Sequence, residues 1–429
     1  MQNNALILED LKYIWHPCTQ MHDHLEKIPL IPIERANGMY LYDFDGNKYL
    51  DCISSWWVNI FGHSHPYINQ KLKEQIDKLE HIIFAGFTHK PIIELSSRLI
   101  NLLDSKLSKC FYADNGSSAI EVALKMAYAS CVYQGKKGNK FLSLENAYHG
   151  ETIGALSVGD VGIYKEVYEP ILLQTLKVKE PKGEDFEESL SSLREIIKSH
   201  KDEIVAFILE PLIQCAGNMN MYSANFVYEA TKLCQENGIY VIFDEIAVGF
   251  GRTGSMFAYE QCGVVPDFLC LSKGISGGYL PLSVVVVGEE IYNLFYAPYE
   301  EHRAFLHSHS YTGNALACAC ANAVLDLFSK EDVITNNKKT SEYIWESMQE
   351  LRRFSFVKNM RICGMVFAFD LEGFDNVRKG LEVFNAGLKR GLLLRPLGNT
   401  IYLMPPYIIT KEQISHIANT LKEILSTFA

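Results

Sequence analysis

Six short apolar runs in the middle of the chain leave few folds open to it. They are KCFYAD (109–114), KFLSLE (140–145), VAFILEP (205–211), YVIFDE (240–245), DFLCLS (267–272) and SVVVVG (283–288). Helical patterns separate some of them, at Ser117–Val132 and near Phe226–Glu236. Strands that are apolar on both faces, with helices between them, predict an α/β fold with a parallel or mixed sheet covered on both sides.

The two ends of the chain follow other patterns. MYLYDFDGNKYLD (39–51) alternates around Asp45-Gly46, which predicts a hairpin. A helical pattern at Ala315–Phe328 leads into a polar stretch, after which helix and strand patterns mix as in a small α+β domain. We therefore expect an N-terminal segment (1–60) that packs with a small C-terminal domain (326–429), and a large domain (61–325) between them.

Composition narrows the classes of partner. The formal net charge is −11 and no basic block occurs, which argues against nucleic acid or an anionic membrane as a partner. The N-terminus lacks a basic segment, so we expect no signal peptide, and the apolar runs are far shorter than the ~20 residues of a spanning helix. Eleven cysteines without a C-x-x-C pair are typical of reduced thiols in a cytoplasmic protein.

The residues just beyond the apolar runs are the first candidates for a site, because ligands of such sheets bind beyond the carboxyl ends of the strands. One of these positions is a Gly116-Ser117-Ser118 turn that opens a helix. Free N–H groups and the helix dipole suit it to a phosphate. The turn matches neither dinucleotide-binding nor P-loop spacing, and an ordinary capped helix would have the same residues.

Asp244 and Lys273 follow two other runs. Lys273 is the one charged residue between Asp267 and Glu289. Burial lowers the pKa of a lysine and favours the free amine, which forms Schiff bases with carbonyl groups. The alternative is a buried Lys–Asp salt bridge, or an Asp244 that pairs with Arg252.

One cofactor needs all of these parts. Pyridoxal phosphate requires a lysine amine, an acid at its ring nitrogen and a phosphate site. Tyr148, after the run at 140–145, could stack on the ring, although a core tyrosine fits the pattern as well. The histidine pairs His63/His65 and His307/His309 have no completing ligands at familiar spacing, so we expect no metal site.

Several longer segments resemble one known family. NGSSAIEVALKMA, ENAYHGETIGALSVG, ILEPLIQCAG, IFDEIAVGFGRTGSMFAYE, PDFLCLSKGISGGYLPLS and YTGNALACA are similar to the class III subgroup of fold-type I aminotransferases. The resemblance implies pyridoxal 5'-phosphate as cofactor and a large domain with a mostly parallel sheet plus a small α+β domain. It also implies a homodimer with active sites at the subunit interface.

Other segments resemble the members of that class that act in biotin biosynthesis. They are WHPCTQM (15–21), SSWWVNIFGHSHP (54–66), HSYTGN (309–314) and LRPLGNTIYLMPPY (394–407). This implies transfer of an amino group from S-adenosylmethionine to 8-amino-7-oxononanoate. Tyr402 stands where glutamate-using relatives carry an arginine, which disfavours glutamate as the donor.

The resemblance also implies a role for each matching residue. Lys273 would hold the cofactor covalently and move the proton, Asp244 would hold the ring nitrogen, and Tyr148 would pack on the ring. Gly116 and Ser117 would bind the phosphate, and Ser308, His309 and Ser310 would reach the cofactor of the neighbouring subunit. Arg395 would receive the carboxylate of the keto acid, to which its planar fork is suited. The substrate pocket would also contain Cys18, Trp56, Tyr148, Lys273, Ser308 and Tyr402. Glu210 and Gln214 would support the site.

Three departures from the family pattern leave alternatives open. Cys18 stands where a tyrosine is usual, Ser308-His309-Ser310 replaces Gly-Pro-Thr, and Val248 replaces a common threonine. Lysine as the donor, another ω-aminotransferase that uses a diamine or a β-amino acid, and a racemase or aminomutase all retain the Lys–Asp–phosphate set. A cofactor-binding protein without catalysis is a further alternative, and Arg395 could be structural.

Overall fold

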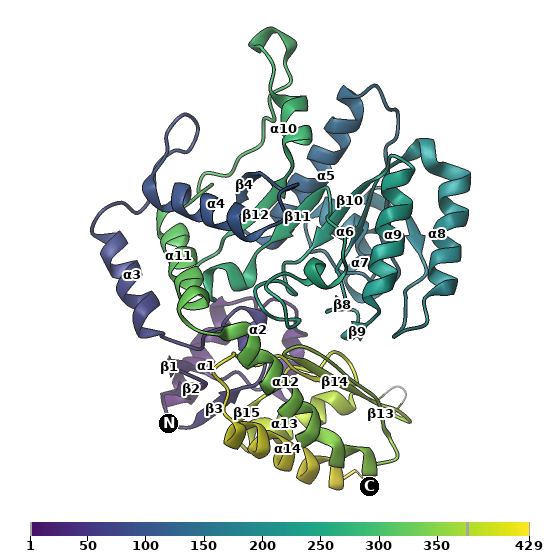
Figure 1. Cartoon of the computed structure of the whole chain (residues 1–429). Helices are drawn as coiled ribbons and strands as arrows, with labels where there is room; N and C mark the ends of the chain where they lie inside the picture. The colour runs from purple at the N-terminus through teal and green to yellow at the C-terminus, as the bar shows by residue number, and fades with distance from the viewer. Residues whose placement is uncertain (1, 375–376, 429) are drawn as a thin grey trace. The chain divides into compact units, whose positions relative to one another are not determined.

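The chain forms two units in a computed structural model that describes residues 2–374 and 377–428. Residues 67–335 form the large unit, and residues 1–66 together with 336–429 form the small unit (Figure 1). The N-terminal residues thus belong to the same unit as the C-terminal residues.

The large unit is built on a seven-stranded sheet with the order β4-β12-β11-β10-β7-β5-β6. β5, β6, β7, β10 and β11 pair in parallel, whereas β12 is antiparallel to both β11 and β4. The predicted α/β architecture is confirmed. The strands are β4 (Lys109–Ala113), β5 (Lys140–Leu144), β6 (Thr175–Val178), β7 (Ile204–Leu209), β10 (Tyr240–Asp244), β11 (Phe268–Leu271) and β12 (Ser283–Val287).

Helices cover this sheet because the strands are apolar on both faces. Small side chains of α5 such as Ala119, Ala123 and Ala127 are fully buried, which lets the helix lie close to the strands. The helices of the large unit are α3 (Pro66–Ile76), α4 (Lys90–Leu102), α5 (Gly116–Tyr133), α6 (Ile153–Val158), α7 (Gly162–Lys165), α8 (Glu187–His200), α9 (Ala224–Glu236), α10 (Glu289–Phe295) and α11 (Ala315–Lys330). The short pair β8 (Ile213–Gln214) and β9 (Asn220–Met221) and the 3₁₀ turn η5 (Lys273–Ser276) complete the parts used below.

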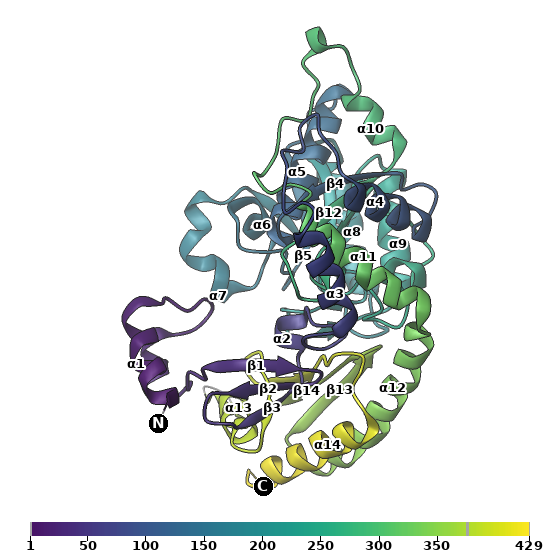
Figure 2. The ribbon, with the colours of Figure 1, turned by 90° about the vertical axis from the view of Figure 1, so that its left-hand side faces the viewer.

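The small unit contains a four-stranded sheet with the order β1-β2-β3-β15, which joins both ends of the chain (Figure 2). It also contains a three-stranded sheet with the order β13-β14-β16, formed by the C-terminal part alone. The predicted hairpin is confirmed, since β2 pairs antiparallel with β3 around Gly46, whose φ is +86°. The strands are β1 (Ile33–Asn37), β2 (Tyr40–Asp43), β3 (Lys48–Asp51), β13 (Val357–Cys363), β14 (Val366–Leu371), β15 (Leu392–Leu393) and β16 (Thr400–Leu403). The helices are α1 (Gln2–Tyr13), α2 (Ser54–Trp57), α12 (Val333–Met348), α13 (Lys379–Leu388) and α14 (Lys411–Ser426).

The element labelled α2 is an unusual turn. Ser54, Ser55, Trp56 and Trp57 have φ values of +50°, +45°, +81° and +74°. Left-handed backbone costs a non-glycine residue roughly 1–2 kcal/mol, so four such residues in succession must be held by their surroundings.

Two further observations concern the cysteines and the helices in the described part of the chain. All eleven cysteines are free thiols. Among the helices that the structure describes, none has both the length and the apolar content needed to cross a bilayer.

Candidate active site

Asp244 and Lys273 come together because their strands are neighbours in the sheet. Asp244 is the last residue of β10 and its Cα pairs with that of Cys270 on β11, three residues before Lys273. Lys273 opens η5 with a φ of +45°, a left-handed conformation of the kind that recurs at functional sites.

The amine of Lys273 lies in surroundings that favour its neutral form. Burial lowers the pKa of Lys273 below its usual range, and the negative charges of Asp244 and Glu210 only partly oppose this. A lysine with this balance is more available as a nucleophile or base near neutral pH than an exposed one.

Asp244 is held by His149, a residue to which the sequence analysis assigns no role. His149 Nδ1 lies 2.8 Å from Asp244 Oδ2, and Asp244 Oδ1 accepts a hydrogen bond of 3.0 Å from the backbone N–H of Ile246. Both side chains are buried, and His149 Nε2 has no hydrogen-bond partner among the residues that the structure describes. An Nδ1–H that donates to the carboxylate fixes the orientation of Asp244.

Glu210 anchors the loop that carries Tyr148. Its two carboxylate oxygens accept hydrogen bonds from the backbone N–H groups of Tyr148 (3.2 Å) and Cys215 (3.0 Å). Burial, with the nearby charge of Asp244, raises the pKa of Glu210 to about 8. The Tyr148 ring lies 5.5 Å from that of Tyr164, measured between centroids, and its hydroxyl donates to Glu151. Gln214 braces the same loop region by donating to the backbone oxygen of Glu145 at 2.7 Å.

The first turn of α5 forms a cradle with its neighbouring loop. Asn115 caps the helix by accepting from the backbone N–H of Ser118 at 3.0 Å. A Cβ at Gly150 would lie 2.1 Å from Ser117 Oγ, and one at Gly116 would lie 3.0 Å from the side chain of Ile246. Gly150, with a φ of +120°, has no room for a side chain beside Ser117, and Gly116 packs closely on Ile246 at the positive end of this 18-residue helix.

The segment around His309 lies beside the end of β4. His309 Nδ1 is 3.8 Å from a carboxylate oxygen of Asp114, the residue after that strand, and His309 Nε2 is 3.3 Å from His307 Nε2. Ser308 and Ser310, on either side of His309, are exposed. The structure therefore places His309 at the strand-end edge and the two serines facing outward.

Three of the four substrate-pocket candidates that belong to the small unit lie together. The Arg395 guanidinium is 5.6 Å from the centroid of the Trp56 ring and donates to the backbone oxygen of Cys18 at 3.1 Å. Trp56 is 42% exposed. The fourth candidate, Tyr402, is buried, and its hydroxyl accepts from Trp57 Nε1 at 3.0 Å. Tyr402 thus supports the turn that carries Trp56.

The large-unit residues fit pyridoxal phosphate by their chemistry. They supply an amine with a lowered pKa, a buried carboxylate with its own hydrogen-bonded histidine, and a helix N-terminus with a glycine cradle. Within residues 2–374 and 377–428, no group of three or more His, Cys, Asp or Glu side chains is arranged to hold a metal ion.

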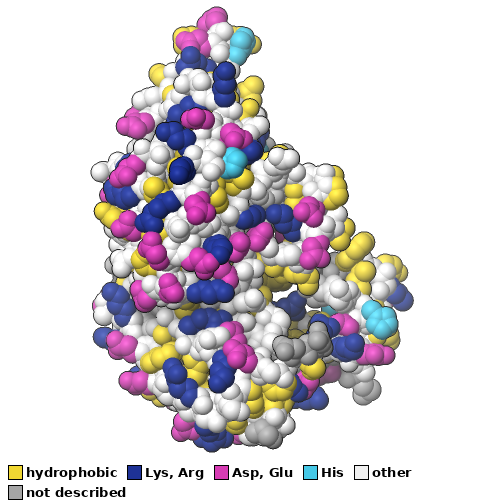
Figure 3. All heavy atoms as spheres, turned by 90° about the vertical axis from the view of Figure 1, so that its right-hand side faces the viewer, with side chains coloured by type: hydrophobic (Ala, Val, Ile, Leu, Met, Phe, Trp, Pro, Cys, Tyr) yellow, Lys and Arg dark blue, Asp and Glu magenta, His cyan; other side chains and the backbone are white. Residues whose placement is uncertain are grey.

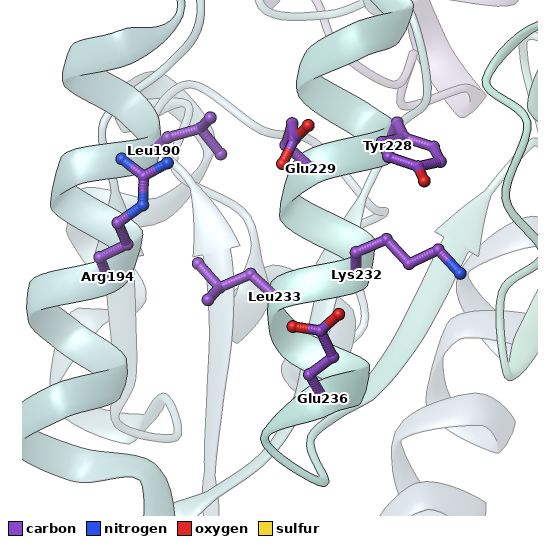
Figure 4. A pocket seen from close by; sticks show the side chains of 7 residues that line it. All are labelled: Leu190, Arg194, Tyr228, Glu229, Lys232, Leu233 and Glu236. Carbon is purple, nitrogen blue, oxygen red and sulfur yellow. The ribbon is translucent and has the colours of Figure 1, made fainter.

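Other surface features lie apart from these residues. A pocket of about 510 Å³ between α8 and α9 is lined by Leu190, Arg194, Tyr228, Glu229, Lys232, Leu233 and Glu236 (Figure 4). On the face shown in Figure 3, acidic and basic side chains are interspersed. The residues that line this pocket are not among those of the candidate site.

The chain is similar to known proteins over nearly its whole length. The family model "Aminotransferase class-III" matches residues 21–425. The chain is 58% identical over 431 residues to the adenosylmethionine-8-amino-7-oxononanoate aminotransferase of Helicobacter pylori, covering 99% of this chain and 98% of that protein. The crystal structure of the enzyme of the same name from Methanocaldococcus jannaschii superimposes with a TM-score of 0.95, at 37% identity and with 99% of each chain covered. A PLP-bound amine transaminase from an uncultivated Pseudomonas species gives a TM-score of 0.90 at 28% identity, covering 97% of this chain and 99% of that one.

Proposed function

Because the chain belongs to the class III aminotransferases, whose cofactor is pyridoxal 5'-phosphate, we propose that it transfers the amino group of S-adenosylmethionine to 8-amino-7-oxononanoate in biotin biosynthesis. The 58% identity to a relative of that name, over almost the whole of both chains, carries the proposal. We place this reaction in the cytoplasm.

The contacts of the large-unit residues support a proposed role for each of them. When bound, the cofactor stabilises the negative charge that develops when a proton leaves the amine-bearing carbon of a substrate. Lys273 holds the cofactor and carries that proton away and back. Asp244, oriented by His149, balances a positive charge on the ring nitrogen. Gly116 and Ser117 bind the phosphate, Tyr148 covers the ring, and Glu210 holds the Tyr148 loop in place.

The small-unit residues bind the acceptor. Arg395 takes the acceptor's carboxylate, since a guanidinium offers two parallel donors to a carboxylate. Trp56, which lies 5.6 Å from that guanidinium, packs on the acceptor's aliphatic chain. Cys18 offers a smaller contact than a tyrosine would, and Tyr402 acts through Trp57.

Arg395→Ala tests the carboxylate role. We expect KM for 8-amino-7-oxononanoate to rise about 10- to 100-fold, as for the loss of a charge-assisted bidentate pair, with the donor half-reaction within about twofold of the parent rate. Arg395→Lys keeps the charge without the fork and should lie between the two. Arg390→Ala is a matched control, because the Arg390 guanidinium donates to the backbone oxygen of Ala386 and pairs with the exposed Glu423. Equal losses for donor and acceptor with Arg395→Ala would mean that Arg395 is structural.

A second amino donor is the main alternative to S-adenosylmethionine. Cys18 in the Arg395–Trp56 group changes the pocket relative to the usual tyrosine, which keeps lysine as the donor, or another ω-aminotransferase reaction with a diamine or β-amino acid, as an alternative.

The donor is identified by mixing the yellow holoenzyme with one amine at a time and following the visible absorbance. S-adenosylmethionine alone is expected to bleach the band near ~420 nm, and 8-amino-7-oxononanoate is expected to restore it. Bleaching by lysine, and not by S-adenosylmethionine, would replace the donor in the proposal. Absence of recovery with the keto acid would remove the acceptor.

We also propose a homodimer with active sites at the subunit interface. In the large unit, the segments 80–89 and 296–314 lie side by side, with the His81 and Tyr311 rings 5.2 Å apart. Large apolar side chains of these segments are exposed, including Ile83, Phe87, Tyr299 and Leu306. Their burial against a second copy would account for them and would bring Ser308 and Ser310 toward the partner.

A further inference from the structure

We infer that Asp51 is a positioning residue for the acceptor, because it holds the left-handed turn that presents Trp56 beside Arg395. This inference rests on the proposed function only in naming the molecule whose binding should change. The turn itself belongs to the small unit and is described by its own contacts.

The turn requires support because its sequence, Ser54-Ser55-Trp56-Trp57, contains no glycine. All four residues have φ between +45° and +81°. Hydrogen bonds from the backbone N–H of Trp57 to Ile53 O (2.8 Å) and of Val58 to Ser54 O (2.9 Å) close it. These bonds alone do not select the left-handed form, which side chains with a Cβ disfavour.

Asp51 stabilises the left-handed form of the turn. Its carboxylate is fully buried, and Oδ1 accepts from the backbone N–H groups of Ile53 (3.1 Å) and Ser55 (3.0 Å). Oδ2 accepts from Ser55 Oγ (2.8 Å) and lies 2.9 Å from His63 Nε2. Four donors thus converge on one carboxylate, two of them from Ser55 in the middle of the turn.

His63 is itself held in the matching orientation. Asn59 Nδ2 lies 3.1 Å from His63 Nδ1, and an amide N–H can only donate. Nδ1 therefore accepts, and Nε2–H points to Asp51. The histidine completes the hydrogen bonds of the buried carboxylate.

The flanks of the turn are anchored, whereas Trp56 is not buried. Ser54 Oγ donates to Met404 O at 2.8 Å, and the buried Trp57 donates its Nε1 to Tyr402 Oη. Trp56 stays 42% exposed with its ring 5.6 Å from the Arg395 guanidinium. Loss of the Asp51 contacts would let Ser55 and Trp56 return to negative φ and move the indole away from Arg395.

Asp51→Ala and Asp51→Asn are the test pair. We expect Asp51→Ala to raise KM for 8-amino-7-oxononanoate about tenfold or more, with cofactor content and the donor half-reaction within about twofold of the parent. Asp51→Asn should lie between the parent and Asp51→Ala, because its oxygen still accepts from Ile53 and Ser55 and its amide can donate to Ser55 Oγ, whereas the hydrogen bond from His63 Nε2 is lost. Adding Ser55→Gly to Asp51→Ala should recover most of the lost affinity, since glycine adopts positive φ without support.

Two outcomes would overturn the inference. One is an acceptor KM that Asp51→Ala leaves unchanged, and the other is an equal loss for donor and acceptor without rescue by Ser55→Gly. If Asp51→Ala does not fold, Ser55→Val, whose branched side chain disfavours positive φ, should raise the acceptor KM alone, and an unchanged KM would again count against Asp51.

Iodide quenching of tryptophan fluorescence separates this inference from the proposed reaction. Asp51→Ala should change the quenching, and the change should vanish in a Trp56→Phe background. The quenching result does not depend on turnover. An inactive parent protein would therefore refute the proposed function and leave the positioning role of Asp51 standing. An unchanged quenching curve for Asp51→Ala would refute the positioning role of Asp51.

Discussion

Replacement of Lys273 by alanine is expected to abolish transamination, with a loss of kcat on the order of a thousandfold or more. Burial lowers the pKa of the Lys273 amine, which lies near Asp244 and Glu210, and so favours the neutral form of this amine. Alanine removes both the attachment of the cofactor and the proton carrier, while the backbone of η5 can remain as it is. Single-turnover kinetics with each substrate, together with the melting temperature, measure this.

Two control variants show whether the loss of kcat comes from the missing amine or from a change in charge or in buried lysines generally. Lys273→Arg keeps a positive charge but cannot act as a neutral amine, so it should be as inactive as the alanine variant. Lys177 is another lysine whose pKa burial lowers, to about 7, but its amine donates to Ser143 Oγ and to the backbone oxygens of Val158 and Gly159. Lys177→Gln should lower the melting temperature and leave kcat within about threefold. A Lys273→Ala enzyme that retains a tenth of parental kcat would exclude the proposed mechanism.

The sheet could be predicted where its strands are buried on both faces. β7 and β12 are fully buried along their length, so their sequences IVAFIL and SVVVV are nearly continuous apolar runs. β6, with the sequence TLKV, lies at the edge of the sheet, is mostly half-buried and carries Lys177, so its pattern resembles a loop. The antiparallel direction of β12 is not visible in the sequence, because a strand buried on both faces has the same pattern in either direction.

The site could be predicted where a residue's place depends on a strand end. Asp244 and Lys273 follow apolar runs, and neighbouring strands bring them together. The contact of His149 with Asp244 depends on how a loop folds over the strand ends, which a single histidine after Tyr148 does not reveal. The left-handed turn at 54–57 was not predictable either, since left-handed backbone is usually signalled by glycine and here depends on Asp51 and His63.

Asp244→Asn is expected to reduce kcat between about a hundredfold and ten-thousandfold, equivalent to about 3 to 5 kcal/mol of transition-state stabilisation. The substitution keeps the shape, and its oxygen can still accept from the backbone N–H of Ile246. Its amide would face His149 Nδ1, so His149 must change tautomer and place a proton on Nε2, which has no partner in the structure. We therefore expect a moderate loss of thermal stability and a large loss of rate, because the negative charge opposite the ring nitrogen is gone.

The neighbouring acid provides the matched control for this prediction. Glu245 is also fully buried, with its pKa raised by burial to about 8, but it accepts from the backbone N–H groups of Ala258 and Tyr259, both at 2.7 Å. Glu245→Gln should lower the melting temperature at least as much as Asp244→Asn and keep kcat within about threefold. If both variants lost rate in proportion to stability, Asp244 would be one more buried carboxylate that supports the fold. A rate loss confined to Asp244→Asn, at equal cofactor content, would assign the charge to the reaction.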